Sequence, residues 1–301
     1  MTASVGFIGT GTIGGPMAMK LLAHGHPLTV FDVNSAATAA HVERGAAQAA
    51  ALSELARGCQ TIFLSLPGPK EIEQVMQAPD GILAHAQPGT TVVDLSTSSV
   101  QLSRSMAERA AAREMEYLDA PVSGGKQAAE AGTLAVMVGG QAAAFERVRA
   151  LIACFGEHIF YMGDSGAGTL TKLVNNQIFL SASVLIQEAF VMGAKAGMDP
   201  AALMEVLKVS SAGPLLAPAP LVLSRKFNLG VFALSIAAKD VGLALESAAS
   251  AGVEMPMAQA ALETYQAALE AGLAQEDFFA TLKTVEARAG VELPPLKRRK
   301  N

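Results

Sequence analysis

The sequence predicts an α/β fold in which a doubly wound, mostly parallel sheet is followed by an all-helical C-terminal domain. Short apolar strand patterns alternate with helical patterns as far as about residue 163, which is typical of a parallel sheet with helices on both faces. From about residue 166 the strand patterns stop and long helical periodicities follow. The 301 residues are enough for two domains, each with a core of its own.

The individual elements follow from local patterns. Strands are predicted where short runs rich in β-branched and other apolar residues end in a turn or a polar residue, at 5–8, 28–31, 61–65, 91–94, 117–119, 134–138 and 158–161. Helical periodicity between these strands predicts helices near 35–43, 69–77, 99–113 and 141–153. Further helices are predicted near 166–196, 200–209, 234–251, 256–271 and 276–288, with breaks at Pro200, at the Pro-rich stretch 214–220 and at Pro256. We therefore divide the chain into domains 1–163 and 164–290 and a flexible basic tail, 291–301.

The composition argues against several classes of protein. A net charge of −5 gives no support for binding to nucleic acid or to an anionic membrane. Two cysteines, Cys59 and Cys154, are too few for a disulfide scaffold or a zinc site, so buried free thiols and no metal are expected. Neither a secretory leader nor an uninterrupted apolar run of about 18–20 residues is evident, which predicts a cytoplasmic protein.

A glycine-rich motif follows the first strand almost at the start of the chain. Gly9-Thr10-Gly11-Thr12-Ile13-Gly14 lies between the strand at 5–8 and an apolar helical pattern. In a dinucleotide site of the Rossmann type, the first glycine allows the tight turn, the second lets the backbone approach a pyrophosphate, and the third lets the helix pack close to the strand. The helix N-terminus then presents N–H groups to the phosphates. We therefore expect Gly9, Thr10, Gly11, Ile13 and Gly14 to bind a dinucleotide cofactor.

An acidic residue ends the second strand. Asp32 follows the strand at 28–31 at the distance from the glycines where a carboxylate holds the adenosine ribose hydroxyls. A carboxylate there repels a 2′-phosphate, and no Lys or Arg follows until Arg44. NAD is therefore the expected cofactor, with NADP as the alternative.

Three further segments follow strands and should lie at the carboxyl edge of the sheet, where open parallel sheets bind ligands. The backbone at Leu66-Pro67 and the hydroxyl of Thr97 are placed to line the nicotinamide half of the cofactor. Successive N–H groups at Ser123-Gly124-Gly125 can form a concave nest for an anion such as a substrate carboxylate.

The catalytic candidate opens the long helix of the second domain. Lys172, Asn175 and Asn176 are spaced i, i+3 and i+4, so they share one helix face, and two Asn in an apolar helix carry a stability cost that indicates a polar site. Hydride transfer to or from an alcohol needs a group that gives or takes a proton. All five histidines lie in the first domain, no Tyr is followed four residues later by Lys, and two Cys make a poor case for zinc. Lysine remains as the acid/base.

Together these segments resemble the β-hydroxyacid dehydrogenase family, which includes 3-hydroxyisobutyrate dehydrogenases and tartronate semialdehyde reductases. The resemblance spans nearly the whole chain and rests on motifs in the family's order and spacing, at 11–18, 119–125, 132–140, 172–176 and 238–244. It implies that Lys172 is the general acid/base, that Asn176 orients the reacting oxygen, and that Ser123, Gly124 and Gly125 bind the substrate carboxylate. It also implies that Lys239 sits beside the nicotinamide. For Lys172 to act as a base near neutral pH, its pKa should be lowered by burial or by a nearby cation such as Lys239.

The chain departs from the family pattern at two places. Ala128 stands where relatives usually carry Gly, and the segment 210–216 is apolar and Pro-rich where polar and aromatic residues are often found. Both departures bear on the substrate and not on the class.

Three functions follow from these expectations. The first is NAD-dependent interconversion of a small 3-hydroxy acid and its semialdehyde. The second is NADPH-dependent reduction of a short semialdehyde such as tartronate or succinate semialdehyde. The third is a dinucleotide-binding sensor without catalysis. The helix at 166–196 is apolar on most faces, which predicts a homodimer or homotetramer formed through the helical domain.

Overall fold

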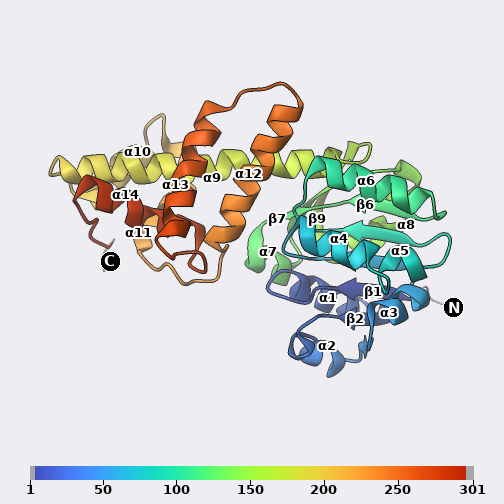
Figure 1. Cartoon of the computed structure of the whole chain (residues 1–301). Coiled ribbons are helices and arrows are strands. Elements are labelled where there is room, and N and C mark those ends of the chain that lie inside the picture. The colour runs from blue at the N-terminus through green and yellow to red at the C-terminus, as the bar shows by residue number, and fades with distance from the viewer. Residues whose placement is uncertain (1–3, 296–301) are drawn as a thin grey trace. The chain divides into compact units, whose positions relative to one another are not determined.

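The computed structural model describes residues 4–295 and consists of two compact units, which are considered separately (Figure 1). The N-terminal unit comprises Met1–Lys172 and the C-terminal unit Leu173–Asn301. The division falls within a helix, after the boundary that the sequence predicts at 163/164. The first turn of that helix makes its hydrogen bonds with the N-terminal unit, through Asp119 and Ser103.

The N-terminal unit is built on a nine-stranded sheet with the order β3-β2-β1-β4-β5-β6-β8-β7, and β9 pairs with β8. Its neighbours from β3 to β6 pair in parallel, while β8 runs antiparallel to β6 and β7 and parallel to β9. The strands are β1 Val5–Ile8, β2 Leu28–Phe31, β3 Ala47–Gln48, β4 Thr61–Leu64, β5 Thr91–Asp94, β6 Glu116–Asp119, β7 Val122–Ser123, β8 Leu134–Gly139 and β9 Gly156–Gly163. Because β1 lies between β2 and β4, its carboxyl end marks the point where the strand order reverses, which is where open α/β sheets bind ligands.

Helices cover both faces of this sheet, as a doubly wound fold requires. Phe7 and Phe63 belong to one buried cluster, while the next residue of β1, Ile8, and the preceding residue of β4, Ile62, belong to another. Successive side chains of a strand point to opposite faces, so the two clusters are the cores on the two sides. The helices of this unit are α1 Gly14–Ala23, α2 Ala39–Val42, α3 Leu52–Gly58, α4 Pro69–Gln77, α5 Ile82–His85, α6 Val100–Ala111, α7 Gly125–Ala131 and α8 Ala142–Ile152, with a 3₁₀ turn at Ser35–Thr38.

The predicted strands and longer helices of this unit are confirmed, whereas five short elements were missed. These are β3, β7, α3, α5 and α7, of which the two strands have only two residues each. Elements this short hold less than two or three periods of a hydrophobic pattern, so periodicity cannot reveal them. Cys59 and Cys154 are buried free thiols, as expected.

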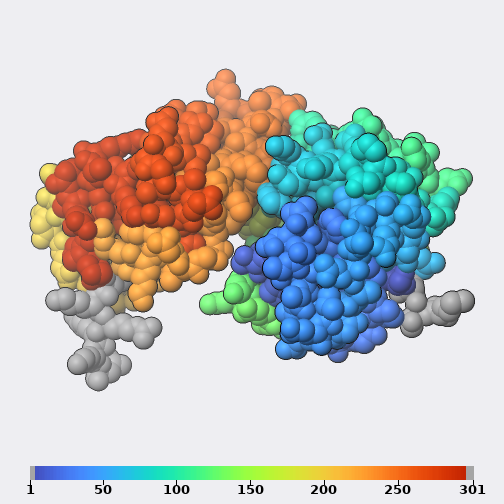
Figure 2. Space-filling model, turned by 60° about the horizontal axis from the view of Figure 1, so that its bottom comes forward, coloured from blue at the N-terminus to red at the C-terminus, as the bar shows by residue number. Residues whose placement is uncertain are grey.

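The C-terminal unit is helical, and among its described residues the sole β pairing is an isolated bridge between Ala233 and Asp277. Its helices are α9 Ala167–Lys195, which begins in the N-terminal unit, α10 Pro200–Lys208, α11 Ala219–Ser224, α12 Leu234–Ser250, α13 Pro256–Glu270 and α14 Thr281–Ala289, with 3₁₀ turns at Gly213–Leu215 and Phe278–Ala280. Phe190, Tyr265, Phe278 and Phe279 are the largest fully buried side chains of its core. In the space-filling view the orange and red residues of this unit form one packed mass (Figure 2).

Helix α9 is long and apolar enough to cross a membrane by length and composition, with a mean hydropathy of 1.4. Helix α9 reaches this mean hydropathy although Gln177, Gln187 and Glu188 interrupt its apolar residues, so the absence of an uninterrupted apolar run did not reveal it. Its apolar character has a structural use, since Leu180, Val184 and Phe190 lie in the core of the C-terminal unit. The buried Gln187 of the same helix accepts a hydrogen bond from the hydroxyl of Thr281 at 2.9 Å.

The packed part of the chain extends beyond residue 291, where the sequence predicts a flexible tail to begin. Leu293 is buried, and its N–H donates to the carboxylate of Glu286 at 2.7 Å. Glu292 pairs with Arg225 at 2.8 Å. Residues 296–301 of the predicted tail lie outside the described residues.

Candidate active site

The glycine-rich turn joins β1 to α1 and leaves no room for larger residues at two of its three glycines. Gly9 has a φ of +89°, and a Cβ there would lie 2.2 Å from the carbonyl oxygen of Ser65. A Cβ on Gly14 would lie 1.9 Å from the carbonyl oxygen of Gly9. A Cβ on Gly11 would meet no heavy atom within 4 Å, so the backbone at Gly11 is open to a ligand. A dinucleotide-binding turn requires close packing at the first and third glycines and an open backbone at the second, and this turn has both.

Asp32 is hydrogen-bonded to this turn. Its Oδ2 accepts from the backbone N–H of Thr10 at 2.8 Å, and its Oδ1 accepts from the N–H of Asn34 at 2.9 Å. The two bonds hold the carboxylate at the end of β2, next to the glycine turn. A carboxylate oxygen can accept more than one hydrogen bond, so Asp32 retains acceptor capacity for ribose hydroxyls.

The N-terminus of α1 faces the same turn. Ile13 precedes the helix, and among the described residues no side chain caps it and none of its first-turn residues is acidic. The early N–H groups of α1 and the positive end of its dipole therefore suit a phosphate group. These features, together with the open backbone at Gly11, fit the pyrophosphate of a dinucleotide.

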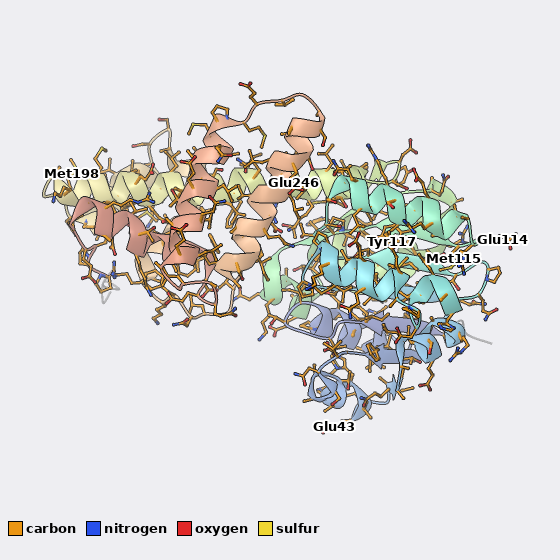
Figure 3. All side chains as sticks on the ribbon, viewed as in Figure 1. Glu43, Glu114, Met115, Tyr117, Met198 and Glu246 are labelled. Carbon is orange, nitrogen blue, oxygen red and sulfur yellow. The ribbon has the colours of Figure 1, made fainter. Side chains whose placement is uncertain are left out.

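A buried hydrogen-bond chain supports the predicted nicotinamide wall at Leu66-Pro67. The N–H of Leu66 donates to Oγ of Ser96 at 2.9 Å, and the N–H of Ser96 donates to Oδ1 of Asp94 at 3.0 Å. The hydroxyl of Tyr117 donates to Oδ2 of Asp94 at 2.6 Å. Tyr117 lies in the interior of the N-terminal unit, in contrast to Glu114 at its margin (Figure 3).

The environment of Asp94 alters its titration. Burial raises the pKa of the Asp94 carboxyl to about 6, against the hydrogen bonds from Ser96 and Tyr117, which lower it. Thr97, the predicted nicotinamide contact on this turn, is half-buried, and Pro67 is exposed.

The predicted anion nest lies between β7 and α7. Ser123 ends β7, and Gly124 and Gly125 have φ values of +129° and +69°, a region that favours glycine. Ala128 packs beneath the nest, since a Cβ on Gly124 would lie 2.6 Å from the Cβ of Ala128. The residue that departs from the family pattern therefore touches the predicted carboxylate site directly.

The predicted catalytic pair lies on α9, one turn apart, with Lys172 at the end of the N-terminal unit and Asn176 in the C-terminal unit. Lys172 is half-buried, and Asn176 is buried. Asn175 is exposed, and its Nδ2 donates to Oδ1 of Asn176 at 3.0 Å.

Asp240 completes this arrangement within the C-terminal unit. Nδ2 of Asn176 donates to Oδ2 of the fully buried Asp240 at 2.6 Å. Lys239, the lysine that the sequence places beside the nicotinamide, lies with its Nζ 3.1 Å from Oδ1 of the same carboxylate. Asp240 thus fixes the amide of Asn176 and balances the charge of Lys239.

Sequence reasoning missed three polar residues that hold the predicted ones in place. They are Asp94, Ser96 and Asp240. Asp240 carried a signal, since an acidic residue within an apolar helical pattern must find a partner once it is buried. The partner itself could not be read from the sequence, because Asn176 lies 64 residues away.

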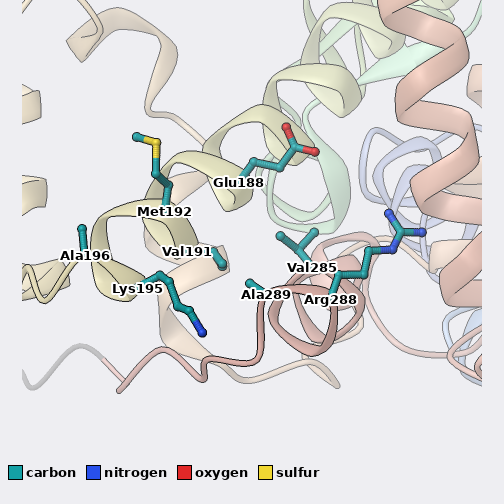
Figure 4. Close-up of a pocket in the computed structure, with 8 residues that line it drawn as sticks. All are labelled: Glu188, Val191, Met192, Lys195, Ala196, Val285, Arg288 and Ala289. Carbon is teal, nitrogen blue, oxygen red and sulfur yellow. The ribbon is translucent and has the colours of Figure 1, made fainter.

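The C-terminal unit contains a pocket that none of these residues lines. It has a volume of about 580 Å³ and lies between the end of α9 and α14. Glu188, Met192 and Lys195 extend from α9, and Arg288 extends from α14 (Figure 4). It contains none of the predicted site residues. Among residues 4–295, no group of three or more His, Cys, Asp or Glu side chains is arranged to hold a metal ion.

Comparison with known proteins agrees with this geometry. A family described as the NAD binding domain of 6-phosphogluconate dehydrogenase matches residues 4–163. A second, described as NAD-binding of NADP-dependent 3-hydroxyisobutyrate dehydrogenase, matches residues 166–285.

Individual relatives cover nearly the whole chain. A 2-(hydroxymethyl)glutarate dehydrogenase of Eubacterium barkeri is 37% identical over 292 residues, which are 96% of this chain and 97% of the relative. An NAD-dependent L-serine dehydrogenase of Pseudomonas aeruginosa is 36% identical over 295 residues, 95% of this chain and 99% of the relative. The solved 3-hydroxyisobutyrate dehydrogenase of Mycobacterium tuberculosis with L-serine has a TM-score of 0.83 and 30% identity, and the match covers 95% of this chain and 99% of that one. The chain therefore belongs to the β-hydroxyacid dehydrogenase family and is an NAD(P)-dependent hydroxyacid dehydrogenase.

Proposed function

We propose that this enzyme uses NAD to interconvert a small 3-hydroxy acid and its semialdehyde, with Lys172 as the general acid/base. The observation that carries the proposal is the pairing of Lys172 and Asn176 one turn apart on α9, with the Asn176 amide fixed by Asp240 at 2.6 Å. A lysine supplies the proton transfer that alcohol oxidation requires, and a fixed amide can donate to the alcohol oxygen.

Each residue then has a defined task. During oxidation, Nζ of Lys172 receives the proton of the substrate hydroxyl. NAD, which the glycine turn at 9–14 and Asp32 would hold, would supply the acceptor for the hydride from the carbon that bears this hydroxyl. Asn176 holds the reacting oxygen through the N–H of its amide that Asp240 leaves available. The N–H groups at Ser123, Gly124 and Gly125 hold the substrate carboxylate, and in the reverse direction Lys172 returns the proton to the aldehyde oxygen.

The substrates of three relatives support a narrower substrate class. Serine, 3-hydroxyisobutyrate and 2-(hydroxymethyl)glutarate share a hydroxymethyl group on the carbon that bears a carboxylate, and they differ in the second substituent of that carbon. We therefore propose a 2-substituted 3-hydroxypropionate as the substrate. Ala128, which packs under the nest at Gly124, is one residue through which this chain can differ from its relatives.

NAD is the proposed cofactor. Asp32 supports it, because its carboxylate is held beside the glycine turn, where it would repel a 2′-phosphate. One of the relatives named above is NAD-dependent.

The test is turnover of a panel of hydroxy acids by the wild type and by Lys172→Ala. The panel holds 3-hydroxyisobutyrate, 3-hydroxypropionate, L-serine, glycerate, threonate, 4-hydroxybutyrate and 2-(hydroxymethyl)glutarate, with NAD and NADP in parallel. Lys208→Ala is the matched control, since Lys208 is an exposed lysine of α10 that pairs with Glu205. NADH binding is measured for each variant.

The proposal predicts turnover of at least one 2-substituted 3-hydroxypropionate, lowered by about 100- to 10,000-fold in Lys172→Ala and retained in Lys208→Ala, with NADH binding intact throughout. Near-normal turnover in Lys172→Ala would remove that residue from the mechanism. NADH binding without turnover of any acid would contradict the substrate proposal and favour a dinucleotide sensor. A preference for NADP with a semialdehyde would favour the reductase alternative.

We also propose that the enzyme is a homo-oligomer assembled through α9. Val174, Ile178, Leu185 and Met192 recur on α9 at the spacing of a single helix face, and Ile178 and Met192 are 64% and 71% exposed. Sedimentation of the wild type should give a dimer or tetramer, and Ile178→Asp combined with Leu185→Glu should lower the mass. A wild type that sediments as a monomer at micromolar concentration would contradict the proposal.

A further inference from the structure

Asp119 occupies the junction of three strands in the N-terminal unit. It is the last residue of β6, paired with Asp94 of β5 on one side and with Gly139 of β8 on the other. Its side chain is 1% exposed, and none of the ion pairs among the described residues includes it. A buried carboxylate without a cation needs other donors.

Those donors come from the start of α9. Oδ1 of Asp119 accepts from the backbone N–H of Gly166, and Oδ2 accepts from that of Thr169, both at 2.8 Å. The first N–H groups of a helix have no partner within the helix, and a negative charge at this end is stabilised by the helix dipole. Asp119 therefore acts as an N-terminal cap supplied by a strand 47 residues earlier in the chain.

The first turn of α9 lies in direct backbone contact with the sheet. A Cβ on Gly168 would lie 2.2 Å from the carbonyl oxygen of Met137 in β8 and 2.4 Å from that of Asp119. The hydroxyls of Ser103 and Thr169 lie 2.9 Å apart and hold the same turn against α6. Lys172 follows Gly168 by one helical turn, so its place on α9 is set by this contact.

The predicted carboxylate nest at 123–125 is attached to strand β8. After Asp119 the chain continues through Pro121, whose carbonyl oxygen accepts from the N–H of Met137 at 3.1 Å. Ser123 then pairs with Ala135 of β8. Asp119 thus stands between the nest and the first turn of α9, and both are attached to β8.

We propose that Asp119 is a positioning residue for the reaction, because its carboxylate fixes the first turn of α9 and so sets the place of Lys172 relative to the nest at 123–125. This inference rests on the proposed role of Lys172. Asp119 touches neither substrate nor cofactor in this scheme. Its effect passes through the helix backbone.

The test compares wild type, Asp119→Asn, Lys172→Ala and the double variant, with a panel acid that the wild type turns over. An amide at position 119 can accept only through its oxygen, and its NH₂ would face an N–H of Gly166 or Thr169. Loss of a hydrogen bond to a charged group corresponds to about 10- to 100-fold in rate. We expect kcat to fall by about that factor while the KM for NAD and the dissociation constant of NADH change by less than about threefold.

Asp94→Asn is the matched control. Asp94 is the buried carboxylate next to Asp119, and it is linked through Ser96 to Leu66, in the predicted nicotinamide wall, and not to α9. We expect Asp94→Asn to raise the KM for NAD more than it lowers kcat. In the Lys172→Ala background, Asp119→Asn should leave the residual turnover unchanged, because a residue that acts through Lys172 has nothing left to position. A further fall in that background would indicate a general structural role and overturn the inference.

Two outcomes separate this inference from the proposed function. If Lys172→Ala keeps near-normal turnover, the role of Lys172 fails, and the inference fails with it. If Lys172→Ala is inactive but Asp119→Asn has the wild-type kcat, only the role of Asp119 is wrong. Should Asp119→Asn not fold, Thr169→Val removes the hydroxyl that contacts Ser103 and hydrogen-bonds to the Asp119 carboxylate, and it keeps the backbone N–H that donates to Oδ2. A fall in kcat of about 3- to 10-fold at constant NADH affinity then supports positioning by this turn, and an unchanged kcat opposes it.

Discussion

Nδ2 of Asn176 lies 2.6 Å from Oδ2 of Asp240, and both side chains are buried. The bond determines which way the Asn176 amide points, because the carboxylate can only accept. Asn175 donates to the oxygen of the same amide, so both ends of the Asn176 side chain are restrained. One N–H of Asn176 remains to donate to a substrate oxygen.

Replacement of Asp240 should therefore damage turnover more than binding. In Asp240→Asn the charge that holds the Asn176 amide and pairs with Lys239 is lost. We expect kcat to fall by about 10- to 100-fold. Steady-state kinetics at saturating NAD measure the effect, and Glu246→Gln, a change on the same helix, is the control. A kcat within about twofold of wild type would show that Asn176 does not depend on Asp240.

The charge of Asp32 should decide between the two cofactors. Asp32→Asn keeps an oxygen that can accept from the N–H of Thr10 but removes the charge that repels a 2′-phosphate. We expect the ratio of kcat/KM for NADP to that for NAD to rise by about tenfold or more. Asp32→Ala also removes the contact with Thr10 and should lower kcat/KM for both cofactors. An unchanged ratio in Asp32→Asn would show that another group discriminates.

Asp94 should make the stability of the fold depend on pH. Burial raises the pKa of its carboxyl from 3.8 to about 6, so in this range the folded state binds the proton more tightly than the unfolded state does. Its contribution to the free energy of unfolding is therefore fully present below about pH 4 and is lost as the pH rises through about 6.

An amide at position 94 does not titrate. The free energy of unfolding of Asp94→Asn, minus that of the wild type, should thus rise by up to about 3 kcal/mol between about pH 4 and pH 7. Urea unfolding at several pH values measures this difference, and Asp164→Asn is a control on a surface loop. A difference that stays constant with pH would mean that Asp94 titrates as an ordinary carboxyl.

The contact between positions 124 and 128 should govern the substrate nest. In Gly124→Ala the new Cβ would collide with the Cβ of Ala128, at a φ of +129° that is itself unfavourable for alanine. We expect the KM for the hydroxy acid to rise by about tenfold or more while the KM for NAD is little changed. Adding Ala128→Gly removes the collision but not the strain, so it should restore affinity in part. An unaltered KM in Gly124→Ala would rule out the nest as the carboxylate site.

Local sequence patterns were sufficient to predict helices and strands that contain several periods of hydrophobic residues. They were not sufficient to predict the hydrogen bonds that hold the site residues in place. The strand at 28–31 and its terminal Asp32 could be predicted because the apolar run, the turn and the acid are contiguous. The bond from Tyr117 to Asp94 and that from Asn176 to Asp240 join residues 23 and 64 positions apart, and no periodicity records such pairs. Helix α3 was missed because its buried Leu52, Leu55 and Ala56 make up little more than one turn.

The alternation of β1 and β4 between the two cores has a consequence for folding accuracy. Phe7 and Phe63 stack in one core with ring centroids 5.9 Å apart, while Ile8 and Ile62 lie in the other. A slip of β4 by one residue would move the ring of Phe63 into the core of Ile8 and would place the smaller Ile62 against Phe7, which leaves a void there. A misaligned sheet would thus lose packing on both faces and gain none on either. Both cores therefore favour the correct alignment of β4.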